Sequence, residues 1–432
     1  GLFEADTSYT ARVTLYAAPG YAFPAGAVSV THSGAIQPIG AFTVDSNGTV
    51  SGDIVFPKTG VYFSGSAAVS MDSAIDLIRQ AQADNLSDPL SLKLVSGTET
   101  VDFTASNTDI DTGLVLDNSN SPAEVILDGG GKTIELTAGN KGSVITVGSG
   151  VTLTLKNITF KGIEPNNIAL ITVVAGGTLV MEDGALITGN KVSTKSGGVY
   201  VNGGTFTMED GAVLTDNMGA YGGVYVDSNG TFNMNGGNII ENNANLGGGG
   251  VYVSGGSFNM NGGKISENTN NNLGSKGGGV YINNGGTFKM KGGEISQNKV
   301  GTSGYGGGVY VNNSSTFTME DGTISDNTAG SRNGGGVCVD DGGSGSTFIM
   351  AGGTISGNKA TNESDGGGVY FKSKGTFTKT GGTIYGSDAE DTLKNTADSG
   401  NGHAVYVYSG KKRNSTAGEG VSLNSGNGTN WE

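Results

Sequence analysis

Residues 250–268 read GVYVSGGSFNMNGGKISEN, and closely related copies of this phrase recur along the chain between Gly197 and Tyr408. Each copy opens with a glycine run and Val-Tyr-Val, continues as Gly-Thr-Phe-Thr-Met and closes as Gly-Gly-Thr-Ile-Ser-x-Asn. The first valines of the eight copies follow one another at intervals of 25 to 36 residues: Val199, Val224, Val251, Val280, Val309, Val337, Val369 and Val405. A period in this range predicts a stacked repeat architecture.

Period-two apolar runs within the repeat predict short β-strands. The valines of residues 251–253 share one face, and so do Phe258 and Met260. Gly and Asn clusters between the runs are turn residues, because they tolerate positive φ. The repeat has no helical spacing, which argues against helical solenoids, and it is short for a four-stranded propeller blade. We therefore predict three short parallel strands per turn of a parallel β-helix.

Stacking of the coils predicts columns of identical residues, because neighbouring strands lie about 4.8 Å apart. A methionine column is expected from Met208 to Met350, where Lys379 ends it. One buried aromatic stack is expected from Phe206, Phe232, Phe258, Phe288, Phe317, Phe348 and Phe377. A buried amide ladder is expected from Asn190, Asn217, Asn242, Asn268, Asn298, Asn327 and Asn358.

These columns carry a family resemblance. Glycine-rich runs, an asparagine ladder and stacked phenylalanines resemble the right-handed parallel β-helix of the pectin-lyase-like superfamily. The paired signatures GGGVYV and ISxN also resemble repeats of large bacterial surface proteins, including adhesins and polymorphic outer-membrane proteins. The resemblance covers roughly residues 70–430. It implies a right-handed coil, an extracellular or cell-surface location, and a role as an adhesin, a binding surface or a stalk.

The chain before the repeats predicts two further units. Alternating apolar residues and turn clusters in residues 1–60 predict four or five antiparallel strands of a small sandwich. The run FEADTSYTARVTLYAAPGYAFP at 3–24 resembles the later half of an immunoglobulin-like surface module. Residues 61–89 are expected to hold a linker and a helix over about 72–84 that caps the first coil. A parallel β-helix of about 10–12 coils, and thus an all-β fold, would then occupy residues 90–432.

Composition limits the classes of partner. The net charge of −15 argues against nucleic acid and against an anionic membrane surface. The sequence has no apolar run of about eighteen residues, so no membrane insertion is predicted. Cys338 is the only cysteine, which excludes an internal disulfide, and it stands where other copies have Tyr. We expect a monomer.

Seven tyrosines form the leading candidate for a binding surface. Alternation places them opposite the buried valines and therefore outward: Tyr200, Tyr225, Tyr252, Tyr281, Tyr310, Tyr370 and Tyr406. Sugar rings stack on aromatic strips, and aromatic residues anchor protein partners. The strip would therefore bind a glycan or a host or cell-surface protein. The alternative is a purely structural column, because Tyr favours strands and stabilises its cross-strand neighbours.

A cation site is a weaker candidate. Asp216, Glu241 and Glu267 precede the ladder asparagines on three consecutive coils, and carboxylate oxygens are ligands that calcium prefers. The alternative is a solvated acidic face. No other cofactor is predicted.

The alternative function is that of a polysaccharide lyase or glycoside hydrolase, which the resemblance also implies. Glycoside cleavage requires two carboxyl groups roughly 5–9.5 Å apart. The regular coils offer no adjacent pair after Val-Tyr-Val. Only the loops 388–399 and 411–419 combine length with mixed charge: Asp388, Glu390, Asp391, Lys411, Lys412 and Arg413. The regularity of the repeats favours binding over catalysis.

Overall fold

In the computed structural model of the chain, every described element is a β-strand. The structure describes residues 142–408 except 332, 341–344 and 373–374, and then 412–419, 421, 423 and 424. Before residue 142 it describes seven strands: β1 (Tyr9–Leu15), β2 (Thr43–Val44), β3 (Val50–Phe56), β4 (Leu90–Lys93), β5 (Thr98–Val101), β6 (Thr112–Leu116) and β7 (Ala123–Leu136). The predicted linker and capping helix of residues 61–89 lie outside the described residues.

Strands β1, β3 and β2 form a three-stranded antiparallel sheet in that order. Tyr9 pairs with Phe56 and Leu15 with Val50. The sandwich of four or five strands predicted for residues 1–60 stays a prediction. The second layer of the predicted sandwich lies outside the described residues.

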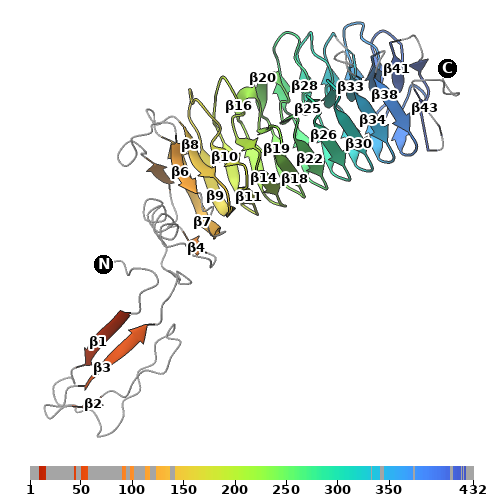
Figure 1. Cartoon of the computed structure of the whole chain (residues 1–432). Helices are drawn as coiled ribbons and strands as arrows, with labels where there is room; N and C mark the ends of the chain where they lie inside the picture. The colour runs from red at the N-terminus through yellow and green to blue at the C-terminus, as the bar shows by residue number, and fades with distance from the viewer. Residues whose placement is uncertain are drawn as a thin grey trace.

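The described residues from Leu90 onward form a parallel β-solenoid of about nine turns (Figure 1). Equivalent strands of successive turns pair in parallel and form ladders along the solenoid. The prediction of ten to twelve coils also counted residues 90–141, where the structure describes only β4 to β7. The parallel β-helix predicted from the repeats is confirmed, while its right-handed sense remains an expectation from the resemblance.

The first ladder contains the Val-Tyr-Val strands. Its members run in parallel from β6 and pair in register, Tyr252 with Tyr281 for example. They are β8 (Ser143–Val147), β10 (Ile171–Val174), β13 (Val199–Asn202), β17 (Val224–Val226), β21 (Val251–Ser254), β25 (Val280–Asn283), β29 (Val309–Val311), β33 (Val337–Val339), β37 (Val369–Phe371) and β41 (Val405–Val407).

The second ladder contains the Phe-x-Met strands. It starts from β7 and β9 (Val151–Lys161), two long strands that also run on into the third ladder. The later members are β11 (Thr178–Met181), β14 (Thr205–Met208), β18 (Thr231–Met234), β22 (Ser257–Met260), β26 (Thr287–Met290), β30 (Thr316–Met319), β34 (Thr347–Met350) and β38 (Thr376–Lys379).

The third ladder contains the isoleucine strands that precede the closing asparagine. They are β12 (Leu186–Thr188), β15 (Val213–Thr215), β19 (Asn238–Ile240), β23 (Lys264–Ser266), β27 (Glu294–Ser296), β31 (Thr323–Ser325), β35 (Thr354–Ser356) and β39 (Thr383–Ile384).

A fourth ladder follows the closing asparagine, where the sequence predicted only a turn. Its seven short strands pair in parallel. They are β16 (Met218–Tyr221), β20 (Asn243–Gly247), β24 (Thr269–Asn270), β28 (Lys299–Val300), β32 (Thr328–Ala329), β36 (Lys359–Ala360) and β40 (Thr396–Ala397). Most have two residues, too few for an apolar alternation to reveal them in the sequence.

The predicted core columns are present. The phenylalanine rings from Phe206 to Phe348 are stacked with centroids 4.6 to 4.8 Å apart and planes within 4 to 6° of parallel. This spacing equals that of neighbouring strands, so the parallel register imposes face-to-face stacking. The methionines of the predicted column are fully buried beside them: Met208, Met234, Met260, Met290, Met319 and Met350. Lys379 continues the methionine column and is itself buried.

The asparagine ladder is also confirmed, and it is longer than predicted. The Oδ1 of Asn298 accepts hydrogen bonds from the backbone N–H and the Nδ2 of Asn268, both at 3.0 Å. Its own Nδ2 donates to the carbonyl of Ile265 and to the Oδ1 of Asn327, both at 2.9 Å. Every polar atom of the buried amide is therefore satisfied. The hydrogen-bonded series runs from Asn166 to Asn395.

The C-terminal segment covers the last turn with antiparallel pairings. β42 (Lys412–Arg413) pairs with β41, and β43 (Leu423–Asn424) pairs with β38. A bridge joins Ala417 to Ile384 of the third ladder. Val421 packs against the core. The outer edges of β41 and β38 are thus occupied by antiparallel partners, which protects them from pairing with another chain.

Candidate functional site

The tyrosine column lies on the outer side of the first ladder, as predicted, but it is not an exposed strip. The side chains of Tyr200, Tyr252, Tyr281, Tyr310 and Tyr370 are only 1 to 5% exposed, and Tyr225 and Tyr406 are half-buried. Four of the buried tyrosines form a second apolar cluster with Cys338, separate from the solenoid core, and Tyr225 and Tyr406 pack against it. The four are Tyr252, Tyr281, Tyr310 and Tyr370. The prediction that these rings are exposed is therefore wrong. Whether any of them binds a ligand stays a prediction.

The fourth ladder and the connections that follow it cover the tyrosines. Tyr221, the last residue of β16, stacks on Tyr252 with ring centroids 3.9 Å apart and planes 10° from parallel. Tyr305, from a later connection, packs against Tyr310 at 5.7 Å. Gly247 lies so close to Tyr281 that an added Cβ would be 2.3 Å from the ring. Because glycine has no Cβ, the backbone at the end of β20 can cross directly over the ring of Tyr281.

Polar residues that follow Val-Tyr-Val satisfy the tyrosine hydroxyls. Tyr200 donates a hydrogen bond to Asp227 at 2.8 Å, and Tyr310 donates to Asp340 at 2.8 Å. Asn283 donates to the hydroxyl of Tyr252 at 3.2 Å. In each pair the polar residue belongs to the next turn of the solenoid. These outward polar positions therefore serve the tyrosine column.

Cys338 occupies the one position where a tyrosine of this column is missing. Its thiol is buried in the cluster, and burial raises the pKa of that thiol above its ordinary value. The residue that would meet a tyrosine hydroxyl on the next turn is Lys372, whose ammonium lies 3.1 Å from Asp340 instead. A buried neutral thiol is unreactive, so Cys338 is best explained as a substitution that the tyrosine column tolerates.

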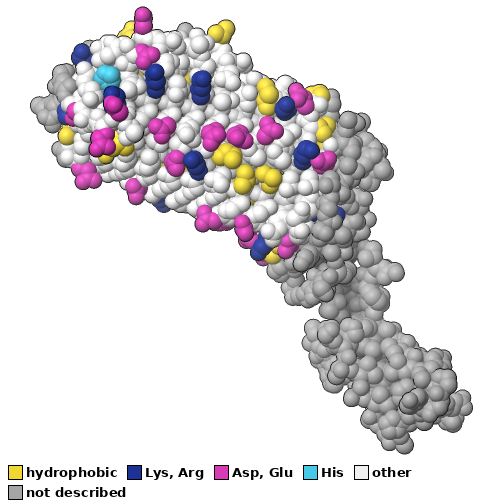
Figure 2. Space-filling model, turned by 180° about the vertical axis from the view of Figure 1, so that it is seen from behind, with side chains coloured by type: hydrophobic (Ala, Val, Ile, Leu, Met, Phe, Trp, Pro, Cys, Tyr) yellow, Lys and Arg dark blue, Asp and Glu magenta, His cyan; other side chains and the backbone are white. Residues whose placement is uncertain are grey.

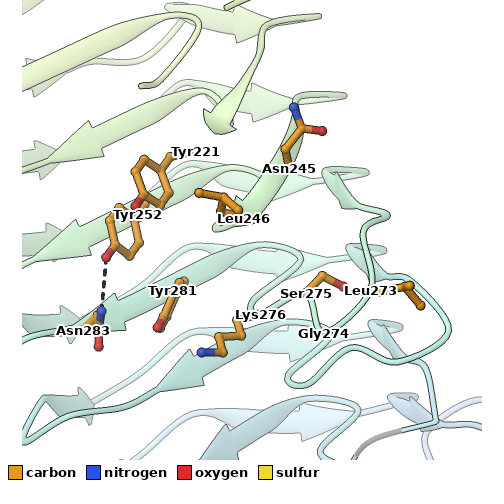
Figure 3. A pocket seen from close by; sticks show the side chains of 10 residues that line it. All are labelled: Tyr221, Asn245, Leu246, Tyr252, Leu273, Gly274, Ser275, Lys276, Tyr281 and Asn283. Carbon is orange, nitrogen blue, oxygen red and sulfur yellow. Dashed lines mark hydrogen bonds between the residues drawn. The ribbon is translucent and has the colours of Figure 1, made fainter. Parts of the chain in front are cut away.

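One part of the tyrosine cluster remains open to solvent. A hollow of about 310 Å³ lies between the connections that cover β21 and β25 (Figure 3). We call it the Tyr–Leu hollow. It is lined by Tyr221, Asn245, Leu246, Tyr252, Leu273, Gly274, Ser275, Lys276, Tyr281 and Asn283. Its volume is at the lower end of the range for small-ligand pockets.

Two leucines form the rim of the Tyr–Leu hollow. Leu246 is 59% exposed and Leu273 is 88% exposed. Hydrogen bonds hold their loops together: Asn272 donates through Nδ2 to the carbonyl of Asn245 at 2.6 Å, and the backbone of Gly248 donates to that of Lys276 at 2.9 Å. The rim is therefore ordered before any ligand arrives.

The lining of the hollow contains a single charged side chain, Lys276. Its Nζ lies 5.8 Å from the ring centroid of Tyr281 and 5.9 Å from that of Tyr310, within cation–π range. Burial, with the nearby hydroxyl of Tyr252, raises the pKa of Tyr221 to about 12, so this phenol stays neutral at pH 7. The hollow is thus locally positive, whereas Asp and Glu are interspersed with Lys and Arg over the face drawn in Figure 2.

The candidate calcium ligands have a conformational explanation. Asp216, Glu241 and Glu267 are exposed corner residues with φ of 53°, 55° and 58°. Gly189 and Gly357 hold the same corner on other turns, with φ of 69° and 65°. In the part of the chain that the structure describes, no three His, Cys, Asp or Glu side chains group closely enough to hold a metal ion. The three carboxylates thus form a solvated row, and the predicted ligand set does not assemble.

Hydrogen bonds join the two loops considered for catalysis, 388–399 and 411–419. The carboxylate of Asp388 accepts hydrogen bonds from the backbone N–H and the hydroxyl of Thr416, both at 2.6 Å. These bonds hold the pKa of Asp388 below its ordinary value, the opposite of what a general acid needs. Arg413 donates to the carbonyl of Thr416 at 3.2 Å, and Asp391 pairs with Lys394 at 2.7 Å. Lys411 lies outside the described residues.

Sequence reasoning missed Tyr221, Leu246, Leu273 and Lys276. A signal for the leucines was present, because both stand in Asn-Leu-Gly triplets of consecutive repeats, within otherwise polar and glycine-rich segments. An isolated apolar residue that recurs in a polar loop is a surface feature rather than a core position.

In three comparisons, no protein-family model, no curated protein and no solved structure matches this chain. Among the described residues, no helix has both the length and the apolar character needed to cross a membrane.

Proposed function

We propose that this chain is a secreted or cell-surface β-helix that binds an external glycan or protein, with the Tyr–Leu hollow as its binding site. One observation carries the proposal. In a regular solenoid whose other large apolar side chains are mostly buried, two leucines stand exposed over an aromatic floor beside a lysine. Exposed apolar surface rimmed by polar residues is typical of interaction sites.

The location and the family belong to the same proposal. Repeat signatures like those of bacterial surface proteins support a monomeric extracellular adhesin or stalk. They also support membership of the pectin-lyase-like superfamily with its right-handed coil, and an immunoglobulin-like module in residues 1–60. A long rod capped at its C-terminal end by antiparallel strands is suited to present one lateral site away from its attachment.

Binding of the full chain to a glycan array and to displayed peptides tests this function. We expect a binder whose affinity falls when Leu273 is replaced by Ser, because that side chain is 88% exposed and its loss leaves the fold intact. Reducing-sugar and unsaturated-product assays run alongside test the alternative of a lyase or hydrolase. Turnover of any polysaccharide that is abolished by Asp388→Asn would contradict the non-enzymatic proposal.

A further inference from the structure

We propose that the occupant of the Tyr–Leu hollow is a protein segment that places an apolar side chain between Leu246 and Leu273 and a neighbouring carboxylate against Lys276. This inference rests on the proposed binding role of the hollow and chooses between the two ligand classes named there. The rim, the floor and the charge of the hollow each contribute an argument.

The rim favours an apolar occupant. Among the described residues, only four large hydrophobic side chains are exposed, and two of them face this hollow from adjacent turns: Val115, Leu246, Leu273 and Tyr408. Covering aliphatic surface stabilises a complex by about 25 cal/mol per Å² when apolar atoms do the covering. Hydroxyl-rich sugar surface gains less from such contact. Two leucines in polar loops therefore indicate a partner with an aliphatic or aromatic side chain.

The floor offers little room for sugar stacking. A sugar ring needs a broad open aromatic face, but Tyr252 and Tyr281 are only 4 and 5% exposed. The ring of Tyr221 lies flat on that of Tyr252, with centroids 3.9 Å apart. The tyrosines thus cover one another's faces. What they leave for a ligand is a small floor of ring edges and polar groups, with room for a single protein side chain rather than a stacked sugar ring.

The positive charge of Lys276 favours a carboxylate beside the apolar side chain of the partner. Lys276 has no carboxylate partner among the described residues, whereas some other lysines of the solenoid pair with carboxylates of adjacent turns, such as Lys264 with Glu294 at 3.3 Å and Lys289 with Glu320 at 2.6 Å. A carboxylate of the partner would complete the same arrangement. Because the chain carries a net charge of −15, a partner that is basic outside this segment would be attracted over longer range.

The test is selection of displayed random linear peptides against the full-length chain. We expect the enriched peptides to share an aliphatic or aromatic residue with Asp or Glu close to it. For a synthetic copy, fluorescence polarisation should show at least about tenfold weaker binding to the Leu246→Ser/Leu273→Ser double variant, the loss typical of anchor contacts. Lys276→Gln should weaken binding and flatten its salt dependence.

Matched controls keep the result interpretable. Val115→Ser changes an exposed side chain on β6, at a residue that does not line the hollow, and should leave binding unchanged. The circular dichroism spectrum and denaturant midpoint of the Leu and Val variants should equal those of the unmodified chain, because the replaced side chains are exposed.

Three outcomes would overturn the inference in distinguishable ways. A glycan whose binding requires Leu273 would retain the proposed function and reject the protein segment. Self-association of the unmodified chain that the double variant abolishes, measured by sedimentation, would make a second copy the occupant. If no enriched peptide or array glycan loses affinity in the double variant, both the inference and the proposed binding role of the hollow fail.

Discussion

The two faces of the Val-Tyr-Val ladder belong to the same strands, yet they are buried by different means. On the inner face Val251 and Val253 are fully buried in the solenoid core, and the same contacts recur on turn after turn. On the outer face Tyr252 is 4% exposed, but its cover is a connecting segment whose length and sequence vary. Cys338 and the Tyr–Leu hollow both occur on the outer face. Departures from the repeat pattern on these strands therefore occur on the face that is covered by connecting segments, rather than on the face that is buried in the core.

Truncating one large ring on each face should separate the two kinds of burial. Phe288→Ala should lower the free energy of unfolding by about 3–5 kcal/mol, because Phe258 and Phe317 hold the cavity open from both sides. Tyr281→Ala should cost less, because the covering loop can settle into the space. Denaturant unfolding of both variants measures the difference, and equal losses would show that the two faces are equally rigid.

The asparagine ladder should be nearly as sensitive as the core. Asn298→Ala removes the acceptor of two buried donors of Asn268 and should cost about 3 kcal/mol, the range for buried unsatisfied polar groups. The exposed amide pair formed by Asn261 and Asn235 is a matched control. Asn261→Ala should shift the denaturant midpoint very little, since water replaces the lost bond. A large shift there would contradict the role assigned to burial.

At the C-terminal end of the inner face, Lys379 interrupts the methionine column. Its Nζ donates to the carbonyls of Gly382 at 2.9 Å and Gly418 at 2.6 Å. Burial lowers the pKa of Lys379 to about 8, with Arg413 acting in the same direction and Glu419 against it. Lys379→Met should therefore stabilise the chain by about 1 kcal/mol at pH 7, because it removes a buried charge and continues the column.

The pH dependence of this difference has a definite sign. Between pH 8 and the ordinary lysine pKa of 10.5 the unfolded chain holds a proton that the folded chain has lost, so the stability of the unmodified chain rises with pH. The advantage of the Met variant should shrink over the same range. Denaturant midpoints of both chains at pH 7 and 10 measure it. An advantage that stays constant would contradict the lowered pKa.

The smallest effect is expected from the outer hydroxyl groups. Tyr310→Phe removes the hydrogen bond to Asp340, which keeps its ion pair with Lys372, and should cost about 1 kcal/mol. Burial raises the pKa of Tyr281 and of Tyr310 well above 10. An absorbance titration should therefore find these phenols neutral at pH 10. Ionisation at an ordinary pKa would show that the covering segments open readily.

The repeats alone predicted the parallel β-helix, the phenylalanine stack, the methionine column and the asparagine ladder. These features are predictable because stacking carries each residue type onto itself, so that one repeat defines the neighbours of the next. The fourth ladder was missed, because strands such as Thr269–Asn270 are defined by backbone pairing between turns and have no side-chain pattern. The capping helix lies outside the described residues.

The candidate site was predicted only in part. Alternation correctly placed Tyr252 and Tyr281 opposite the core, but it could not indicate that Tyr221, at the end of β16, lies over Tyr252. The same limit applies to Asp216, Glu241 and Glu267, whose left-handed backbone at an exposed corner appears only in three dimensions.

The sequence by itself determined which residues lie inside the coil, because period two and exact repetition leave one way to bury Val, Phe, Met and Ile together. Only the tertiary structure decided what the outward tyrosines do. Their cover comes from irregular connections that obey no period and are positioned by glycines such as Gly247. The hollow with Leu246 and Leu273 is a product of those connections. The hollow forms because the chain crosses over the outer face of the first ladder, and no local sequence pattern predicts that path.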